Sequence, residues 1–143
     1  MAAALLSGML NRHGNSRDWS IRSAGTWAEA NQPAMALAQL VMAERGLGLE
    51  GHRSQPLDRE LLQQADVILV MTDSQREAMQ IEFPEVANKT YLTSQLIDQS
   101  FDIEDPVGGT IDDYRRCARD LENILTAGFD HLVKLTQSSG QTE

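Results

Sequence analysis

Residues 65–75 read Ala-Asp-Val-Ile-Leu-Val-Met-Thr-Asp-Ser-Gln and indicate an α/β fold. The five apolar residues over 67–71 are typical of a parallel strand covered on both faces. Thr72 follows this run, and Gln75 stands three residues later, a spacing that predicts a capping box and the start of a helix. We expect that helix to end before Pro84, because the residue before a proline disfavours helical backbone.

Further helices and strands are predicted on either side of this strand and helix. The expected helices cover residues 3–12, 33–45 and 57–64, and the expected strands cover residues 20–24, 67–71 and 89–92. A long loop over 93–109 follows the last strand. Helices that alternate with short apolar strands indicate an α/β fold with a parallel sheet.

The last predicted helix has the clearest pattern. Thr110 and Asp113 have the spacing of an N-terminal cap. Apolar or small residues then recur in steps of three and four, at Ile111, Tyr114, Ala118, Leu121, Leu125, Gly128, Leu132 and Leu135. We expect one long helix packed along a sheet. A coiled-coil seam is the alternative, although such a seam rarely carries a glycine.

Length and composition limit the function classes. A chain of 143 residues suits one domain, here expected over residues 1–135 with a flexible tail over 136–143. The net charge of −9 argues against nucleic acid or an anionic membrane as partners. No apolar run approaches the ~20 residues of a membrane helix. The single cysteine excludes an internal disulfide and fits a reducing cytoplasm.

Asp105 is the leading candidate for chemistry. It opens the string Asp-Pro-Val-Gly-Gly over 105–109, just before the last helix. A rigid proline and two glycines beside an aspartate are typical of a general acid carried on a loop. The alternative is an ordinary turn, because Asp-Pro alone is common turn chemistry.

Four motifs in this order and spacing resemble the low-molecular-weight protein tyrosine phosphatase family. They are residues 23–27 (Ser-Ala-Gly-Thr-Trp), residues 52–54 (His-Arg-Ser), residues 65–72, and residues 105–109 followed by Tyr114. The resemblance implies a doubly wound sheet of four parallel strands in the order 2-1-3-4, with helices on both faces. It also implies a hydrolase that acts through a phosphocysteine intermediate and needs no metal or cofactor.

The same resemblance implies that part of the family pattern precedes Met1. Family members begin with the central strand of the sheet, which runs into a Cys-x5-Arg-Ser phosphate loop and then a helix. Residues 1–6 resemble that helix, so the nucleophile, the loop and the central first strand are expected upstream. Cys117 does not replace the nucleophile, because the residue six places later is Asn123 and not arginine. Sheet strands left unpaired in this way are sites of possible self-association.

The resemblance assigns roles to named residues. Asp105 would protonate the leaving group and then deprotonate the hydrolytic water. Ser23 and His52 would hold the phosphate loop in shape, whereas the residues alone favour a turn serine and a satisfied buried histidine. Trp27, Val107 and Tyr114 would line the substrate slot, although Trp27 equally suits a partly exposed core position.

The substrate and the activity stay open at this level. Val107 and Gly108 stand where two tyrosines often follow the Asp-Pro of eukaryotic members, and a Gly-Gly version occurs in bacterial members, including protein-arginine phosphatases. Phosphotyrosine and phosphoarginine proteins, or a small phosphate ester, are therefore the candidate substrates once a loop is present. The chain as given is expected to be inactive. A non-catalytic interaction or regulatory relative is the alternative, but retention of Asp105, Ser23 and His52 favours the phosphatase.

Overall fold

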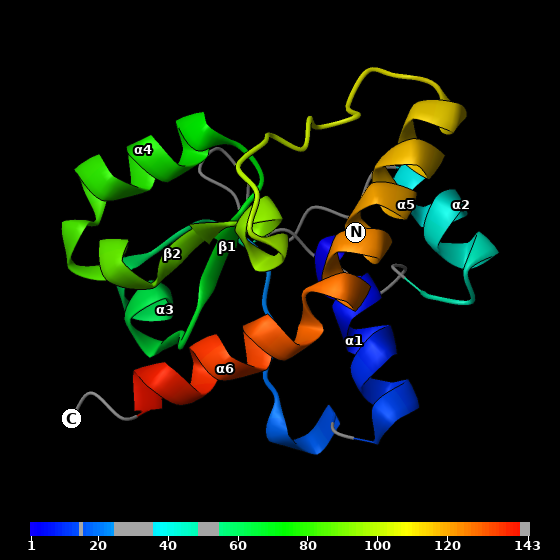
Figure 1. The fold of residues 1–143 in the computed structure, drawn as a ribbon. Helices are drawn as coiled ribbons and strands as arrows, with labels where there is room; N and C mark the ends of the chain where they lie inside the picture. The colour runs from blue at the N-terminus through cyan, green and yellow to red at the C-terminus, as the bar shows by residue number, and fades with distance from the viewer. Residues whose placement is uncertain (15, 25–35, 49–54, 141–143) are drawn as a thin grey trace. The chain divides into compact units, whose positions relative to one another are not determined.

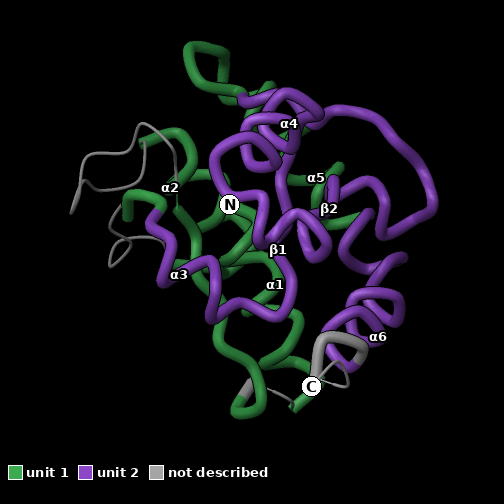
Figure 2. The backbone as a smooth tube through the Cα atoms, turned by 90° about the vertical axis from the view of Figure 1, so that its left-hand side faces the viewer, with its two compact units in different colours: residues 1–57, 106–123 green, residues 58–105, 124–143 purple. Residues whose placement is uncertain are grey.

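A computed structural model of the chain describes residues 1–14, 16–24, 36–48 and 55–140. The chain forms two compact units, which Figure 2 shows in separate colours. Unit 1 comprises residues 1–57 and 106–123, and unit 2 comprises residues 58–105 and 124–143. The two units are described separately below.

Unit 2 is built on a strand, a helix and a second strand. Strand β1 (Ile68–Val70) leads into helix α4 (Asp73–Glu82), and strand β2 (Thr90–Leu92) pairs with β1 in parallel, with Ile68 opposite Thr90. The predicted strands over 67–71 and 89–92 are confirmed in shortened form. The capping box is also confirmed, because the Thr72 hydroxyl accepts the Gln75 N–H at 3.2 Å while the Gln75 side chain accepts the Thr72 N–H at 3.3 Å.

The remaining elements of unit 2 surround this strand pair. They are α3 (Arg59–Gln64), the 3-10 helices η2 (Pro84–Lys89) and η3 (Thr93–Ile97), the end of α5 (Ile111–Ala127), and α6 (Phe129–Gly140). Helices α4 and α6 lie on opposite sides of the strand pair (Figures 1 and 2). The core of the unit consists of Leu62, Met79, Val86, Leu92, Leu96, Ile103, Ile124, Leu125 and Leu132.

The predicted strand over residues 20–24 is wrong. These residues are irregular, and the only strand pairing within the described residues is that of β1 with β2. A strand forms only where a neighbour satisfies its N–H and C=O groups, and the side chains over 20–24 are mostly exposed, so packing does not hold an extended backbone either. Of the three strands predicted within this chain, the described residues form two, and β1 is only half-buried.

Unit 1 consists mainly of helices. It contains α1 (Ala2–His13), the short 3-10 helix η1 (Ser16–Asp18), α2 (Ala36–Glu44) and the larger part of α5. Two ion pairs join the end of α2 to α5, from Arg45 to Glu122 at 3.1 Å and from Arg115 to Glu44 at 2.7 Å. The hydrogen bond from Arg115 lowers the pKa of Glu44. The core contains Leu5, Leu6, Met9, Leu10, Ala38, Val41, Met42, Tyr114, Ala118 and Leu121.

The predicted single long helix is in fact two helices. Helix α5 ends at Ala127 and α6 begins at Phe129, with Gly128 between them, and α6 continues over 136–140 of the expected tail. A Cβ on Gly128 would lie 2.6 Å from the Cβ of Leu96 and 2.8 Å from its carbonyl oxygen. The apolar periodicity runs through this position unchanged, so only the close approach of η3 explains why glycine stands there.

We expect Gly128→Ala to destabilise the protein by about 1–3 kcal/mol, the usual cost of forcing extra atoms into a packed site. Chemical denaturation measures this free energy of unfolding. Thr126→Ala, at an exposed position of the same helical segment, is the matched control and should stay within about 0.5 kcal/mol of the parent. An alanine at 128 with parental stability would show that η3 does not pack against this glycine.

Candidate active-site loop

The loop that carries Asp105 starts at the end of η3 and returns to the carboxyl end of β1. Asp98 ends η3 with a positive φ of 59°, a left-handed conformation that aspartate tolerates. Its N–H donates to the carbonyl of Gln95 at 3.1 Å. The carboxyl ends of parallel strands are where open α/β sheets place their ligands. The loop therefore brings an acidic segment to the carboxyl edge of this sheet.

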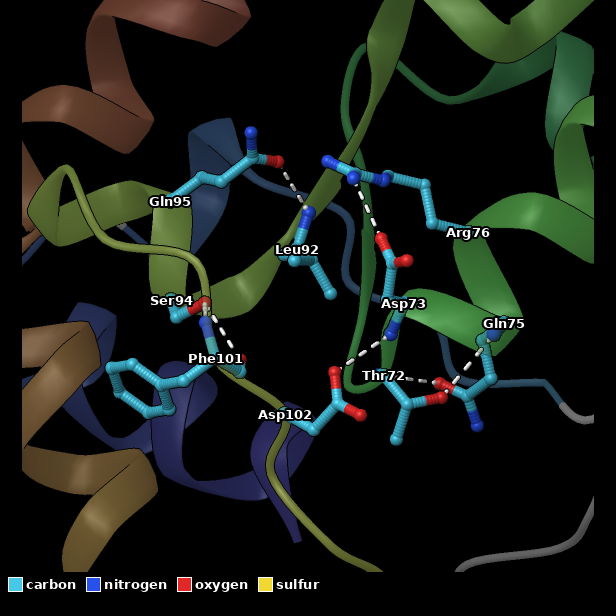
Figure 3. Close-up of polar contacts among 9 residues, drawn as sticks. All are labelled: Thr72, Asp73, Gln75, Arg76, Leu92, Ser94, Gln95, Phe101 and Asp102. Carbon is cyan, nitrogen blue, oxygen red and sulfur yellow. Dashed lines mark hydrogen bonds and ion pairs between the residues drawn. The ribbon is translucent and has the colours of Figure 1, made fainter.

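Ser94 fixes the middle of the loop. Its hydroxyl donates to the carbonyl of Phe101 at 2.8 Å and accepts the N–H of Phe101 at 3.0 Å (Figure 3). The Ser94 residue is completely buried, and both hydrogen bonds are part-buried because Phe101 is exposed. Ser94 thus binds both the backbone N–H and the backbone carbonyl of Phe101.

The next two residues bind the loop to the junction of β1 and α4. The Asp102 carboxylate accepts the N–H of Asp73, the first residue of α4, at 2.8 Å (Figure 3). The N–H of Ile103 donates to the carbonyl of Met71 at 2.8 Å, and the Ile103 side chain is buried. Three consecutive residues are therefore anchored, the last of them two positions before Asp105.

The polar groups at the junction of β1 and α4 have hydrogen-bond partners of their own. The Gln75 side chain accepts the N–H of Met71 at 2.9 Å in addition to that of Thr72. Arg76 pairs with the Asp73 carboxylate at 2.6 Å, and the buried hydroxyl of Thr93 donates to the carbonyl of Val70 at 3.0 Å. The end of β1 is therefore a firm support for the loop.

The turn after Asp105 belongs to unit 1 and leads into α5. The N–H of Gly109 donates to the carbonyl of Pro106 at 2.8 Å, and Gly108 has a φ of +84°. Thr110 and Asp113 cap α5 as the sequence predicts, because the Asp113 carboxylate accepts the Thr110 N–H at 2.9 Å and the Thr110 hydroxyl accepts the Asp113 N–H at 3.3 Å. Hydrogen bonds to the Asp113 carboxylate from the backbone N–H of Thr110, and then from its side chain, lower the pKa of Asp113.

The predicted site residues occupy different kinds of position. Asp105 is exposed, and Val107 is 58% exposed. Tyr114 is buried in the core of unit 1. Ser23 is exposed in the irregular segment of unit 1. The predictions for Trp27 and His52 fall outside the described residues.

Two residues that matter for the loop were not predicted as functional. Ser94 has no signal in the sequence, because a serine before a loop is unremarkable until its burial is known. Asp102 has a weak signal, because it stands three residues before Asp105 in an acidic segment. Its partner Asp73 is 29 residues away along the chain, and no local pattern connects them.

The described residues limit the chemistry that the loop can perform. An exposed carboxylate on an anchored loop can give a proton to a leaving group or take one from water. No group of three or more His, Cys, Asp or Glu side chains over the described ranges could hold a metal ion. Cys117 lies on α5 and is partly exposed.

None of the described helices is long and apolar enough to cross a lipid bilayer.

Comparisons with known proteins give a consistent result. A family model for the low molecular weight phosphotyrosine protein phosphatases matches residues 1–138. A protein-arginine-phosphatase of Bacillus subtilis is 32% identical over 126 residues, which cover 87% of this chain and 82% of the relative.

Two solved structures extend the likeness to the backbone. The first is a mutant of the YwlE arginine phosphatase with a phosphorylated active-site serine, which matches with a TM-score of 0.83 at 28% identity, over 99% of this chain and 88% of that chain. The second, Vibrio vulnificus Wzb in complex with benzylphosphonate, matches with a TM-score of 0.78 at 31% identity, over 88% of this chain and 84% of that chain.

We expect Gly109→Ala to disrupt the cap of α5. A Cβ on Gly109 would lie 2.6 Å from Oδ2 of Asp113 and 2.9 Å from the carbonyl oxygen of Pro106. Moving the Asp113 carboxylate away from Thr110 should raise its pKa towards the ordinary value. Because the folded-state pKa of Asp113 is lowered, the carboxylate stabilises the fold at neutral pH, and this contribution is lost as the pH falls through the folded-state pKa.

Carboxyl NMR titration measures this pKa directly. Val107→Ala, in the same turn at an exposed position, is the control and should leave the pKa of Asp113 lowered. An unchanged pKa in the Gly109→Ala protein would show that the turn accommodates a side chain and that the glycine is not required for the cap.

Proposed function

Since this chain belongs to the low molecular weight phosphotyrosine protein phosphatase family, we propose that it forms the acid-bearing part of a protein phosphatase. The observation that carries the proposal is the anchoring of the Asp105 loop at the carboxyl end of β1. An aspartate on a loop held at three successive residues suits a general acid, which must stay within hydrogen-bond reach of the atom it protonates.

The proposed reaction has two steps. In the first, a cysteine thiolate attacks phosphorus, the bond from phosphorus to the leaving atom breaks, and the Asp105 carboxylic acid gives its proton to that atom. In the second, the Asp105 carboxylate takes a proton from water as the water oxygen attacks phosphorus and the thiolate leaves. The relative with a phosphorylated active-site serine supports a covalent phosphoenzyme in this family.

The nucleophile must come from a segment outside these 143 residues. The sequence contains one cysteine, Cys117, and no Cys-x5-Arg motif. We therefore propose that the chain alone does not turn over phosphate compounds, and that a strand with a Cys-x5-Arg-Ser loop completes the site. Ser23 and His52 would support that loop. A thiolate nucleophile suits the reducing cytoplasm in which we place the protein.

We propose a phosphorylated protein side chain as the substrate, with phosphoarginine favoured over phosphotyrosine. Val107 and Gly108 follow the Asp105-Pro106 pair, so this part of the substrate slot offers one exposed aliphatic side chain and no aromatic one. The similarity to a protein-arginine-phosphatase supports the same choice. Trp27 and Tyr114 are the remaining proposed walls, and Tyr114 is buried in unit 1.

A non-catalytic interaction or regulatory protein is the second candidate function. The absence of a Cys-x5-Arg motif from the 143 residues favours it. In that case the anchored loop would serve only to support the fold. Activity of a completed protein separates the two functions.

We expect activity to appear when the chain is extended at its N-terminus with the strand and Cys-x5-Arg-Ser-Pro segment of a bacterial relative. In that extended protein, Asp105→Asn should lower turnover by about 10²–10⁴-fold, the usual contribution of a general acid. The loss should be larger for alkyl phosphates, whose leaving groups need the proton most, than for p-nitrophenyl phosphate. Steady-state rates on a leaving-group series measure the difference.

Two controls accompany this measurement. The extended protein with serine in place of the loop cysteine should be inactive, and the unextended chain should show no hydrolysis that Cys117→Ser removes. Phosphoarginine peptide should be hydrolysed faster than phosphotyrosine peptide. An Asp105→Asn protein with equal losses for all leaving groups, or with none, would contradict the proposed role of Asp105. An extended protein that folds but stays inactive would favour the non-catalytic function.

A further inference from the structure

We propose that Asp102 is a positioning residue that holds Asp105 in its catalytic place by binding the N-terminus of α4. This inference rests on the proposed function, because it assumes that Asp105 is the general acid. The side chain of Asp102 would not touch the substrate. It would act through the loop backbone, which it ties to the first residue of α4.

The geometry supports a positioning role. The Asp102 carboxylate lies 2.8 Å from the N of Asp73, the first N–H of α4 (Figure 3). An anion at a helix N-terminus is favoured by the helix dipole and by the N–H groups that lack an intrahelical partner. Arg76 neutralises the nearby Asp73 side chain at 2.6 Å. A carboxylate at position 102 is therefore well suited to this contact.

The helix does not need Asp102 in order to form. Thr72 and Gln75 already supply a complete capping box, and water can satisfy the remaining N–H group because the contact is exposed. An exposed hydrogen bond of this kind contributes little to global stability. Its main consequence is local, because it ties the loop to α4 three residues before Asp105.

Variants at the other two anchors, Ser94 and Ile103, would not test the positioning role separately from the stability of the fold. Ser94 is completely buried, so its replacement would disturb the core. The anchor at Ile103 is a backbone hydrogen bond and a buried side chain. Asp102 alone is exposed and acts through its side chain. Its removal should loosen the loop while the fold persists.

A small displacement of Asp105 is expected to matter for catalysis. Release of Asp102 removes the side-chain link to α4 and leaves the anchors at Phe101 and Ile103, so we expect a small displacement of the loop rather than its detachment. A misplacement of about 1 Å can lower a rate by about 100-fold. The loss of rate should affect the first step, in which the leaving group takes a proton from Asp105. It should therefore depend on the leaving group in the same way as the effect of removing Asp105.

The test uses the extended protein, with variants Asp102→Ala and Asp102→Asn and with Gln99→Ala as the control. Gln99 is an exposed polar residue of the same loop, and its backbone N–H donates to the carbonyl of Ser94 at 3.2 Å, a contact that alanine retains. We expect Asp102→Ala to lower kcat for alkyl phosphates by about 10–100-fold and to have a much smaller effect on p-nitrophenyl phosphate. Asp102→Asn should recover most of the loss, because its amide oxygen can accept the Asp73 N–H. Gln99→Ala should behave as the parent.

A double-mutant cycle completes the test. If Asp102 acts through Asp105, Asp102→Ala should cause almost no further loss in an Asp105→Asn background. Equal losses for all leaving groups, or the same loss in both backgrounds, would overturn the inference and leave Asp102 a structural residue. The inference would also be overturned if Asp105→Asn lowered turnover as expected while Asp102→Ala had the activity of the parent. In that case the proposed function would still stand. An Asp105→Asn protein without any loss would instead contradict the proposed function.

Discussion

The hydrogen bond from the N–H of Ile103 to the carbonyl of Met71 joins the acidic loop to the end of β1, and the candidate site depends on it. Met71 is the residue between the strand and the capping residue of α4, so this bond links loop, strand and helix at one point. The Ser94 and Asp102 contacts on the preceding residues hold the same segment from other directions. Asp105 gains a defined place because the chain before it cannot move freely.

Strand β1, which supports this loop, is more apolar in sequence than its burial in the structure requires. The run over 67–71 has the composition of a parallel strand covered on both faces, yet β1 is half-buried and pairs with β2 alone within the described residues. A two-stranded parallel sheet offers few backbone partners, so side-chain packing must supply most of its stability. The strand of the proposed Cys-x5-Arg segment would add a second partner for β1. The proposed segment would therefore serve the packing of β1 as well as the chemistry of the proposed phosphatase.

The sequence predicted features that depend on local spacing. The sequence predicts the caps of Thr72 with Gln75 and of Thr110 with Asp113 because each pair needs only a spacing of three positions. The strand over 20–24 was not predicted correctly, since a strand needs a neighbour that local composition cannot guarantee. The break at Gly128 follows from the close approach of Leu96, and the role of Asp102 follows from Asp73, both distant along the chain. Asp105 was therefore identifiable from the sequence as a candidate, whereas the contacts that hold its loop were not.

Amide hydrogen exchange in the unaltered 143-residue chain tests most directly whether the loop is held in this way. The N–H groups of Phe101 and Ile103 donate to Ser94 and Met71, and the N–H of Asp73 donates to Asp102. We predict that these three amides exchange slowly, as amides within α4 do, whereas the amide of the exposed Ser100 exchanges rapidly. Exchange of all three at the rate of Ser100 would contradict the account, because the acidic loop would then lack its anchors.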